Sequence, residues 1–293
     1  METKIEIRSI IKPDEMRKTE DLQRLIWPGA DRDIVPDHML LAVVRNGGIV
    51  LGAFDQDHLV GFVLGFLGTD SETASELAMT RLKHHSHMLG VHPEYRNLGI
   101  GYQLKLAQRK LVMRQGVRLI TWTYDPLQSR NGYLNISRLG CVCGTYEATA
   151  YGEMDDALNV GIPSDRFMVD WWITSPRVRA RVEQKHTKLD LAHYLAGGAK
   201  KLNPTTLDAR GLPVPPETIE TSNASILLIE IPSDYQKIKE VDHALALLWR
   251  MQTRQLFEDA FSQGYLVTDF IHFREEKIPR SFYVLIQGEM TLG

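Results

Sequence analysis

The chain has 293 residues, of which 43% are hydrophobic, enough to build the core of one large domain or two ordinary ones. The formal net charge is −3 and Lys and Arg form no long block, which argues against a nucleic-acid partner. The opening METKIEIRSI is charged, and the longest strongly apolar stretch, residues 59–68, is about half of a membrane-spanning helix. We therefore expect a soluble, cytoplasmic protein with no membrane partner.

Strands and helices alternate through the first 175 residues. The pattern predicts a strand, two helices and a hairpin, at residues 4–10, 13–26, 37–48 and 49–68. It then predicts a strand, a helix, a strand, a short helix and two strands, at residues 85–91, 101–115, 117–125, 130–140, 141–152 and 166–173. Cys141 and Cys143 are two residues apart, too close for an ordinary disulfide, and C-x-x-C metal spacing is absent, so we expect a reduced protein without a metal.

The pattern changes after residue 200. Residues 203–224 contain four prolines without periodicity, which is typical of an extended connector. We therefore predict a domain over residues 1–200, a connector over 201–224 and a C-terminal α/β region over 225–293. This last region begins with the same order of strand, Pro, helix, Gln-Gly and strand as residues 88–124. It is either a degenerate half-copy or an instance of a common arrangement.

The segment HHSHMLGVHPEYRNLGIGYQLKLAQRK, residues 84–110, carries the clearest chemical signal. A loop with Arg96, Gly99 and Gly101 follows a strand and opens a helix. Free N–H groups and the helix dipole favour an anion there, and glycines let the backbone approach a phosphate. The Walker pattern is absent, and Leu104 replaces the last small residue of a dinucleotide fingerprint. The loop instead fits [Q/R]-x-x-G-x-[G/A].

This loop pattern, together with the order of elements over residues 4–175, resembles the Gcn5-related N-acetyltransferase (GNAT) superfamily. The longer motifs SHMLGVHPEYRNLGIGYQLKLAQR, ITWTYDPLQSRN, LNISRLG and PSDRFMVDW resemble a bacterial branch associated with N-acylamino acid racemases, some of whose members are thought to succinylate amino acids. The resemblance implies an α/β fold whose mixed, mostly antiparallel central sheet is flanked by helices. Residues 225–293 would be an addition to this fold.

The resemblance also implies an acyl-coenzyme A cosubstrate, acetyl-CoA or succinyl-CoA, and no metal. The loop amides would hold its pyrophosphate, and the preceding strand would pair with the pantetheine arm and polarise the thioester carbonyl. It assigns cosubstrate binding to Leu89, Gly90, Val91, Arg96, Asn97, Leu98, Gly99, Ile100 and Gly101.

His85 and His87 would share one face of the predicted strand. Near pH 7.4 only about one alkylamine molecule in a thousand is neutral, which corresponds to a free-energy cost of roughly 4 kcal/mol. A histidine base can remove the proton from the ammonium form and so relieve this cost. This H-x-H resembles the arylalkylamine N-acetyltransferases, so we predict His87 as the base, directly or through water, and His85 as its assistant. The alternatives are structural histidines or catalysis from the opposite face, where Ser86 stands in place of the glutamate base of some members.

The remaining candidates follow this strand along the chain. Many members have a tyrosine that acts as the general acid, and Ile136 stands at its position. Tyr133 lies one turn earlier and is the candidate acid. A thiol has a pKa of about 8.5, so the thiolate can also leave without a protein acid. Arg166 is a candidate for gripping an acceptor carboxylate, unless it pairs with Asp165 or Asp170. Asn131 and Asp125 are further candidates for the acceptor site, or have packing and capping roles.

We therefore predict an enzyme that transfers an acetyl or succinyl group from acyl-CoA to a small amine, most simply an amino acid. Because no cysteine lies beside the loop, direct transfer in a ternary complex is expected. The alternatives are a non-catalytic acyl-CoA-binding sensor and an acyltransferase for a peptide or protein amine. For the oligomeric state, a homodimer is the candidate.

Overall fold

The computed structural model describes residues 4–28, 34–69, 82–152, 160–273 and 279–288. The chain divides into two compact units, residues 1–122 (unit 1) and residues 123–293 (unit 2). The predicted division at residues 200 and 225 stays a prediction, because compact units and domains need not coincide. Among the described residues, no helix combines the length and the apolar character needed to cross a membrane.

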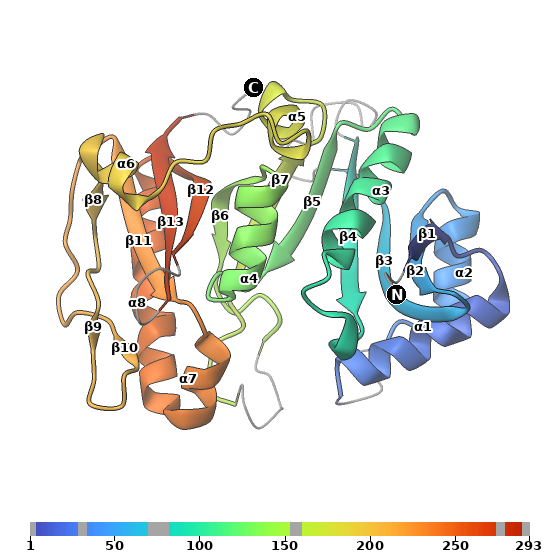
Figure 1. Cartoon of the computed structure of the whole chain (residues 1–293), viewed down its shortest axis with the longest axis horizontal. Helices are drawn as coiled ribbons and strands as arrows, with labels where there is room; N and C mark the ends of the chain where they lie inside the picture. Colours follow the sequence, from blue (N-terminus) through green and yellow to red (C-terminus); the bar gives the residue numbers. More distant parts are fainter. Residues whose placement is uncertain (1–3, 29–33, 70–81, 153–159, 274–278, 289–293) are drawn as a thin grey trace. The chain divides into compact units, whose positions relative to one another are not determined.

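The elements of unit 1 follow the predicted order (Figure 1). They are β1 (Ile5–Ser9), α1 (Pro13–Ile26), α2 (Asp37–Arg45), β2 (Ile49–Asp55), β3 (His58–Thr69), β4 (Leu82–Val91), the 3₁₀ turn η3 (Pro93–Tyr95), α3 (Ile100–Arg114) and β5 (Leu119–Tyr124), whose last two residues lie in unit 2.

The sheet of unit 1 has the order β1-β2-β3-β4-β5. Its first three pairings are antiparallel and the β4–β5 pairing is parallel. Phe62 of β3 packs with apolar residues of α1 and α2 on one face. The neighbouring Gly61 points to the other face, where a Cβ would meet Ile100 and Leu104 of α3. Helices therefore cover both faces of this mixed sheet.

A β-bulge interrupts the pairing of β3 with β4. Leu64 pairs with Met88 and Phe66 pairs with His85, so two residues of β4 lie opposite the single residue Gly65. Such a bulge adds a residue to one strand and changes the direction of the side chains that follow it. Here it falls within the histidine segment.

Gly65 is needed at the bulge because the space beside it is filled. A Cβ at this position would lie 2.7 Å from the carbonyl oxygen of His85 and 2.8 Å from Nε2 of Gln108, and closer still to the ring of His84. In contrast, a Cβ at Gly68, three residues along the same strand, would meet nothing within 4 Å.

Unit 2 contains the remaining elements (Figure 1). They are α4 (Ser129–Gly132), the π-helical turn η4 (Tyr133–Arg138), β6 (Val142–Glu147), β7 (Arg166–Trp172), α5 (Pro176–Val182), α6 (Leu191–Ala196), β8 (Lys200–Lys201), β9 (Thr206–Leu207), β10 (Pro213–Val214), β11 (Ile226–Pro232), α7 (Tyr235–Val241), α8 (His243–Ser262), β12 (Tyr265–Phe273) and β13 (Arg280–Gln287).

The strands of unit 2 follow the order β7-β6-β12-β13-β11-β8, and β9 and β10 form a separate ribbon. Strand β13 lies between β11 and β12, whereas β4 and β5 pair directly in the similar segment of unit 1.

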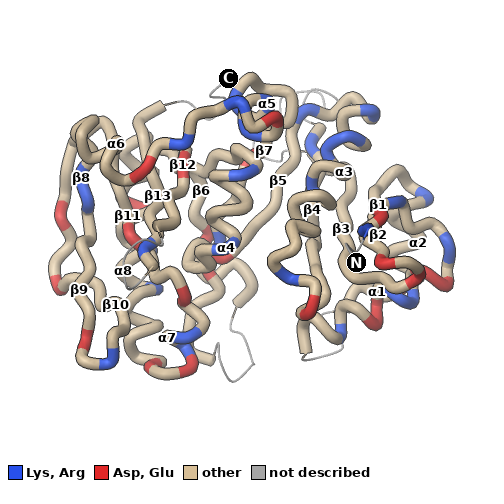
Figure 2. The backbone as a smooth tube through the Cα atoms, viewed as in Figure 1, with Lys and Arg blue, Asp and Glu red and all other residues tan. Residues whose placement is uncertain are grey.

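In both units basic and acidic residues are interspersed along the elements, in keeping with the small net charge of −3 (Figure 2).

The proline-rich segment packs against the C-terminal elements. Trp249 Nε1 donates a hydrogen bond to the Pro213 carbonyl at 2.9 Å, and Tyr265 Oη donates to the Ala224 carbonyl at 2.7 Å. The helical segment between β11 and β12 is two helices, because Asp242 accepts a hydrogen bond from the Leu245 amide and caps a new helix.

We expect Gly65→Ala to lower the free energy of unfolding by about 1–3 kcal/mol, because the added methyl group overpacks the bulge. Gly68→Ala is the matched control on the same strand and should change it by less than about 0.5 kcal/mol. Urea unfolding followed by tryptophan fluorescence measures both values. Equal effects of the two substitutions would contradict the close packing at Gly65.

Candidate active site

The loop before α3 has the backbone conformation of an anion cradle. Asn97 and Gly99 have φ angles of 69° and 76°, and Gly99 is the N-cap of α3. Residues 96–99 are exposed, and a Cβ at Gly99 would meet nothing within 4 Å. Because the first N–H groups of a helix lack partners one turn earlier within it, the amides at this end are candidates for holding an anion.

Two contacts anchor this loop to the sheet. Tyr95 Oη donates a hydrogen bond to Oδ2 of Asp55 at 2.8 Å, and the His92 amide donates to the Val60 carbonyl at 2.9 Å. The loop is thus fixed to the turn between β2 and β3.

One edge of β4 lies open within unit 1. The parallel pairing with β5 comprises His84 with Ile120 and His85 with Thr121. From Ser86 to Val91, this edge of β4 has no strand neighbour among the described residues of the unit. Backbone groups on an open edge can pair with an extended ligand. Leu89, Gly90 and Val91, which we predicted as cosubstrate residues, lie on this segment.

His85 and His87 share one face of β4, as predicted. Their ring centroids are 6.0 Å apart, and the Phe66 ring lies 5.5 Å from His85 and 5.9 Å from His87. His85 is half-buried, and His87 is exposed. The three rings form a small aromatic cluster at the bulge.

His84 and Ser86 point to the opposite face, which α3 covers. Lys105 Nζ donates a hydrogen bond to Ser86 Oγ at 2.8 Å and lies 3.5 Å from the centroid of the Trp122 ring. Gln108 links Ser86 and the His84 ring, at 3.0 Å and 3.2 Å. The Ser86 side is therefore packed with protein, and the side that holds His85 and His87 is the accessible one.

The surroundings keep these imidazoles neutral. Burial lowers the pKa of His84 to about 3, and the charge of Lys105 adds to the effect. Burial also lowers the pKa of His85 to about 4, with smaller contributions from His87, Lys83 and Lys105. The pKa of His87 is lowered in the same way by desolvation, although its side chain reaches solvent. A neutral imidazole can accept a proton.

The other candidates lie in unit 2. Tyr133 begins the π-helical turn, and its Oη accepts a hydrogen bond from Lys188 Nζ at 3.3 Å. Asp125 and Arg166 line one cavity of about 190 Å³, and Asn131 lies in α4 and is not among its lining residues. Arg166 donates to the main-chain carbonyl of Asp165, not to its carboxylate.

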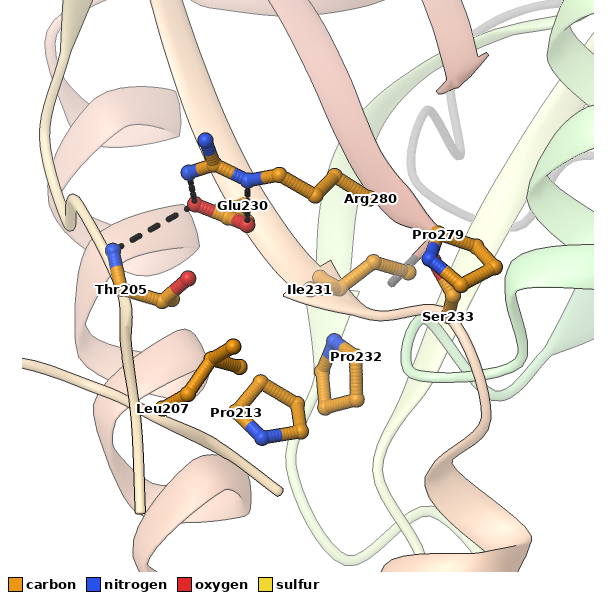
Figure 3. Close-up of a pocket in the computed structure, with 9 residues that line it drawn as sticks. All are labelled: Thr205, Leu207, Pro213, Glu230, Ile231, Pro232, Ser233, Pro279 and Arg280. Atoms are coloured by element: carbon orange, nitrogen blue, oxygen red, sulfur yellow. Dashed lines mark hydrogen bonds and ion pairs between the residues drawn. The ribbon is translucent and has the colours of Figure 1, made fainter. Parts of the chain in front are cut away.

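A second cavity in unit 2, of about 200 Å³, lies beside β9, β10 and β11. Figure 3 shows Arg280 and Glu230 facing each other at this cavity, with Nε–Oε1 and Nη2–Oε2 distances of 2.7 and 2.6 Å. The Thr205 amide also donates to Glu230. Because its charges already satisfy each other, this cavity offers little to a charged substrate.

Lys105 and Arg250 are buried cations that the sequence analysis overlooked. The sequence contained a signal for Lys105, because Gln108 and Val112 follow it by three and seven residues and share its face of α3. Arg250 gave no such signal, because its partner Asp125 is distant in sequence.

Within the described ranges, no group of three or more His, Cys, Asp or Glu side chains could hold a metal ion.

One family of known proteins is similar to the segment that contains this site. The model of the acetyltransferase (GNAT) family matches residues 14–133. No curated protein matches the sequence.

Three solved structures of acetyltransferases are similar to the chain at low sequence identity. Arabidopsis thaliana NAA60 in complex with acetyl-CoA is 19% identical, with a TM-score of 0.46 over 58% of this chain and 99% of that one. Aminoglycoside 6'-acetyltransferase type Ii is 22% identical, with a TM-score of 0.44 over 58% of this chain and 98% of that one. An N-acetyltransferase from Staphylococcus aureus Mu50 is 13% identical, with a TM-score of 0.45 over 58% and 99%.

The expected α/β fold class with a mixed sheet flanked by helices is confirmed, and a further C-terminal α/β region follows. The match to the acetyltransferase (GNAT) family model, over residues 14–133, includes β4, the glycine loop and α3.

Proposed function

We propose that this enzyme transfers an acetyl or succinyl group to the amino group of a small amine, an amino acid, by direct transfer in a ternary complex. The observation that carries the proposal is the continuity of one segment. The accessible histidine pair, the open strand edge and the glycine loop follow one another in β4 and the start of α3. The resemblance to the racemase-associated branch favours an amino-acid acceptor.

The residues of unit 1 fit an acyl-CoA cosubstrate, which supplies an acyl group activated as a thioester. The amides of residues 97–101 would hold its pyrophosphate, with Arg96 at the same exposed loop. Leu89, Gly90 and Val91 would pair with the extended pantetheine arm, because this edge of β4 has no strand neighbour in the described part of unit 1.

His87 would accept the proton from the acceptor ammonium, directly or through a water molecule. It is exposed and neutral, and its imidazole nitrogen can take the proton that otherwise blocks the amine lone pair. His85 lies beside it, with ring centroids 6.0 Å apart, and would help to orient the amine or water. The covered position of Ser86 favours the histidine face over the opposite one.

A covalent acyl-enzyme is disfavoured by the state of the two cysteines. Cys141 and Cys143 are both fully buried. Burial also raises the pKa of the Cys143 thiol well above its usual value, so a thiolate nucleophile is suppressed. Direct attack by the amine is therefore favoured.

Tyr133 remains the candidate acid for the departing thiolate. Burial would raise the pKa of Tyr133, but its hydrogen bond with Lys188 and nearby positive charge outweigh burial and lower it. A lowered pKa makes the phenol a better proton donor, which supports the proposal. Arg166, Asp125 and Asn131 remain candidates for the acceptor site.

Purified protein supplied with acetyl-CoA or succinyl-CoA and pooled D- and L-amino acids should release free CoA thiol in proportion to acceptor. We expect His87→Ala to lower kcat/KM by about 100-fold or more, because it removes the general base. The control His58→Ala changes an exposed histidine on β3 and should leave the rate unchanged.

Thiol detection and mass spectrometry of the acylated product measure this outcome. Full activity of His87→Ala would show that His87 is not the general base, while the proposed acyl transfer would still stand. Binding of acyl-CoA without thiol release for any free amino acid would favour a sensor or a peptide substrate instead.

The pH dependence should reflect the lowered histidine pKa values. A base works only when unprotonated, so the ratio of wild-type to His87→Ala rates should be constant at about pH 7 to 8 and fall in more acidic solution, with a midpoint below the ordinary histidine pKa. Taking the ratio cancels the titration of the amine itself. A midpoint at or above the ordinary histidine value of about 6.5 would contradict a desolvated base.

Two glycines at opposite ends of α3 test the cradle. Gly99 and Gly116 both have φ of 76° and open space at the Cβ position, so valine strains the backbone equally at each site. We expect Gly99→Val to raise the Kd for CoA at least about tenfold, since it hinders close approach of the pyrophosphate. Gly116→Val should leave the Kd unchanged. Calorimetry measures both, and equal Kd values would argue against the loop as the cradle.

A further inference from the structure

Phe66 of β3 lies against both histidines of the accessible face of β4. Its ring centroid is 5.5 Å from that of His85 and 5.9 Å from that of His87, and the two imidazole centroids are 6.0 Å apart. The ring planes are inclined to one another by 43°, 48° and 49°. These distances lie in the range at which aromatic rings attract one another. Each ring of this aromatic cluster therefore contacts the other two.

The register shift at the bulge is what brings Phe66 opposite a histidine. Continuing the register that precedes the bulge would pair Phe66 with Ser86 and His87 with Gly65. Instead Phe66 pairs with His85. Gly65, the residue of β3 at the bulge, has no side chain to contact His87. The ring that reaches His87 across the strands is that of Phe66.

The neighbouring residue Leu67 provides a contrast on the same strand. Phe66 is 37% exposed and Leu67 is 40% exposed, so the two apolar side chains are similarly accessible to solvent. Successive side chains of a strand point to opposite faces. Leu67 accordingly pairs with His84, whose ring lies 3.2 Å from Nε2 of Gln108 on the face that α3 covers. A partly exposed apolar residue of β3 therefore contacts the accessible histidines only at the position of Phe66.

Exclusion of water, more than charge, sets the protonation state of His87. Desolvation lowers the pKa of His87, although its side chain reaches solvent. His85 is also lowered by burial, and the charged or titratable groups that act on it are His87, Lys83 of β4 and Lys105 of α3. An aromatic ring beside an imidazole excludes water on that side, and this disfavours the charged form. Phe66 is the neighbour of His87 on β3 that does this.

Contact with Phe66 also restricts the orientation of the imidazole. An exposed side chain exchanges among several rotamers, whereas packing against a ring favours one of them. Proton transfer is sensitive to the distance and direction between the donor and the acceptor atoms. A fixed imidazole therefore serves proton transfer better than a freely rotating one.

We propose that Phe66 is a positioning residue for acyl transfer, whose ring holds the His87 imidazole in the orientation that accepts the proton of the acceptor ammonium. The inference rests on the proposed role of His87 as the base. Phe66 acts through His87, and the proton moves from the ammonium nitrogen to the imidazole nitrogen as before.

The first test requires no substrate. The full chain is labelled at its ten histidines and titrated with NMR detection of the imidazole signals, and the signal missing from His87→Ala identifies His87. In Phe66→Ala the pKa of His87 should rise toward the ordinary value of about 6.5, because water reaches the side that the ring covered. The matched control Leu67→Ala should leave the pKa of His87 at its wild-type value.

The second test is kinetic. Phe66→Ala should lower kcat by about tenfold and leave the KM for acyl-CoA unchanged, because the base is misplaced and the cosubstrate site is not. Phe66→Leu keeps an apolar cover without the flat ring and should lie between the wild type and Phe66→Ala. It is also the variant to use should alanine disturb the strand, which circular dichroism detects. Leu67→Ala should have the wild-type kcat.

A double variant separates action through the base from a general effect on the strand. Because Phe66 acts through His87, Phe66→Ala combined with His87→Ala should be no slower than His87→Ala alone. Effects that multiply in the double variant would overturn the positioning role.

The base assignment and the positioning role fail in different ways. If His87→Ala is fully active, the base assignment falls and the positioning role falls with it, whatever the NMR titration shows. If His87→Ala is slow but Phe66→Ala and Phe66→Leu keep the wild-type kcat and the wild-type pKa of His87, the base stands and the inference about Phe66 is wrong.

Discussion

The bulge in β4 opposite Gly65 is the constraint on which the site of unit 1 depends. Two residues of β4 fit against one residue of β3 because Gly65 has no side chain to occupy the space beside the His84 ring and Gln108. His84 and Ser86 face α3, whereas His85 and His87 face the accessible side. Since β4 leads directly into the loop and α3, the same strand sets the spacing between the histidines and the anion cradle.

Buried charge accounts for much of the chemistry in both units. In unit 1, Lys105 is stabilised by Ser86 and the Trp122 ring, and its charge together with burial favours neutral His84 and His85. In unit 2, Asp125 holds the buried Arg250. Both cations are retained inside the protein at the cost of desolvation, and each lies beside a candidate binding or catalytic group.

The C-terminal elements complete unit 2 through specific bonds. Trp249 binds the proline-rich segment, and Arg254 binds the Asp165 carboxylate ahead of β7. Arg177 and Arg181 of α5 bind the main chain and the carboxylate of β12, respectively. The three arginine contacts each join residues more than eighty positions apart in the sequence. Helix α8 and strand β12 are therefore integrated with the earlier part of unit 2, and β12 also pairs with β6.

Local pattern by itself determined the order of strands and helices, the glycine loop and the shared face of His85 and His87. These features depend on side-chain periodicity and on backbone preferences within a few residues, which the sequence displays directly. The bulge, the covered position of Ser86, the break at Asp242 and the pairing of Asp125 with Arg250 were decided by tertiary structure. Each depends on a packing partner on another element, such as Gln108 for Ser86, and neither periodicity nor spacing along the chain reveals which distant residues will meet.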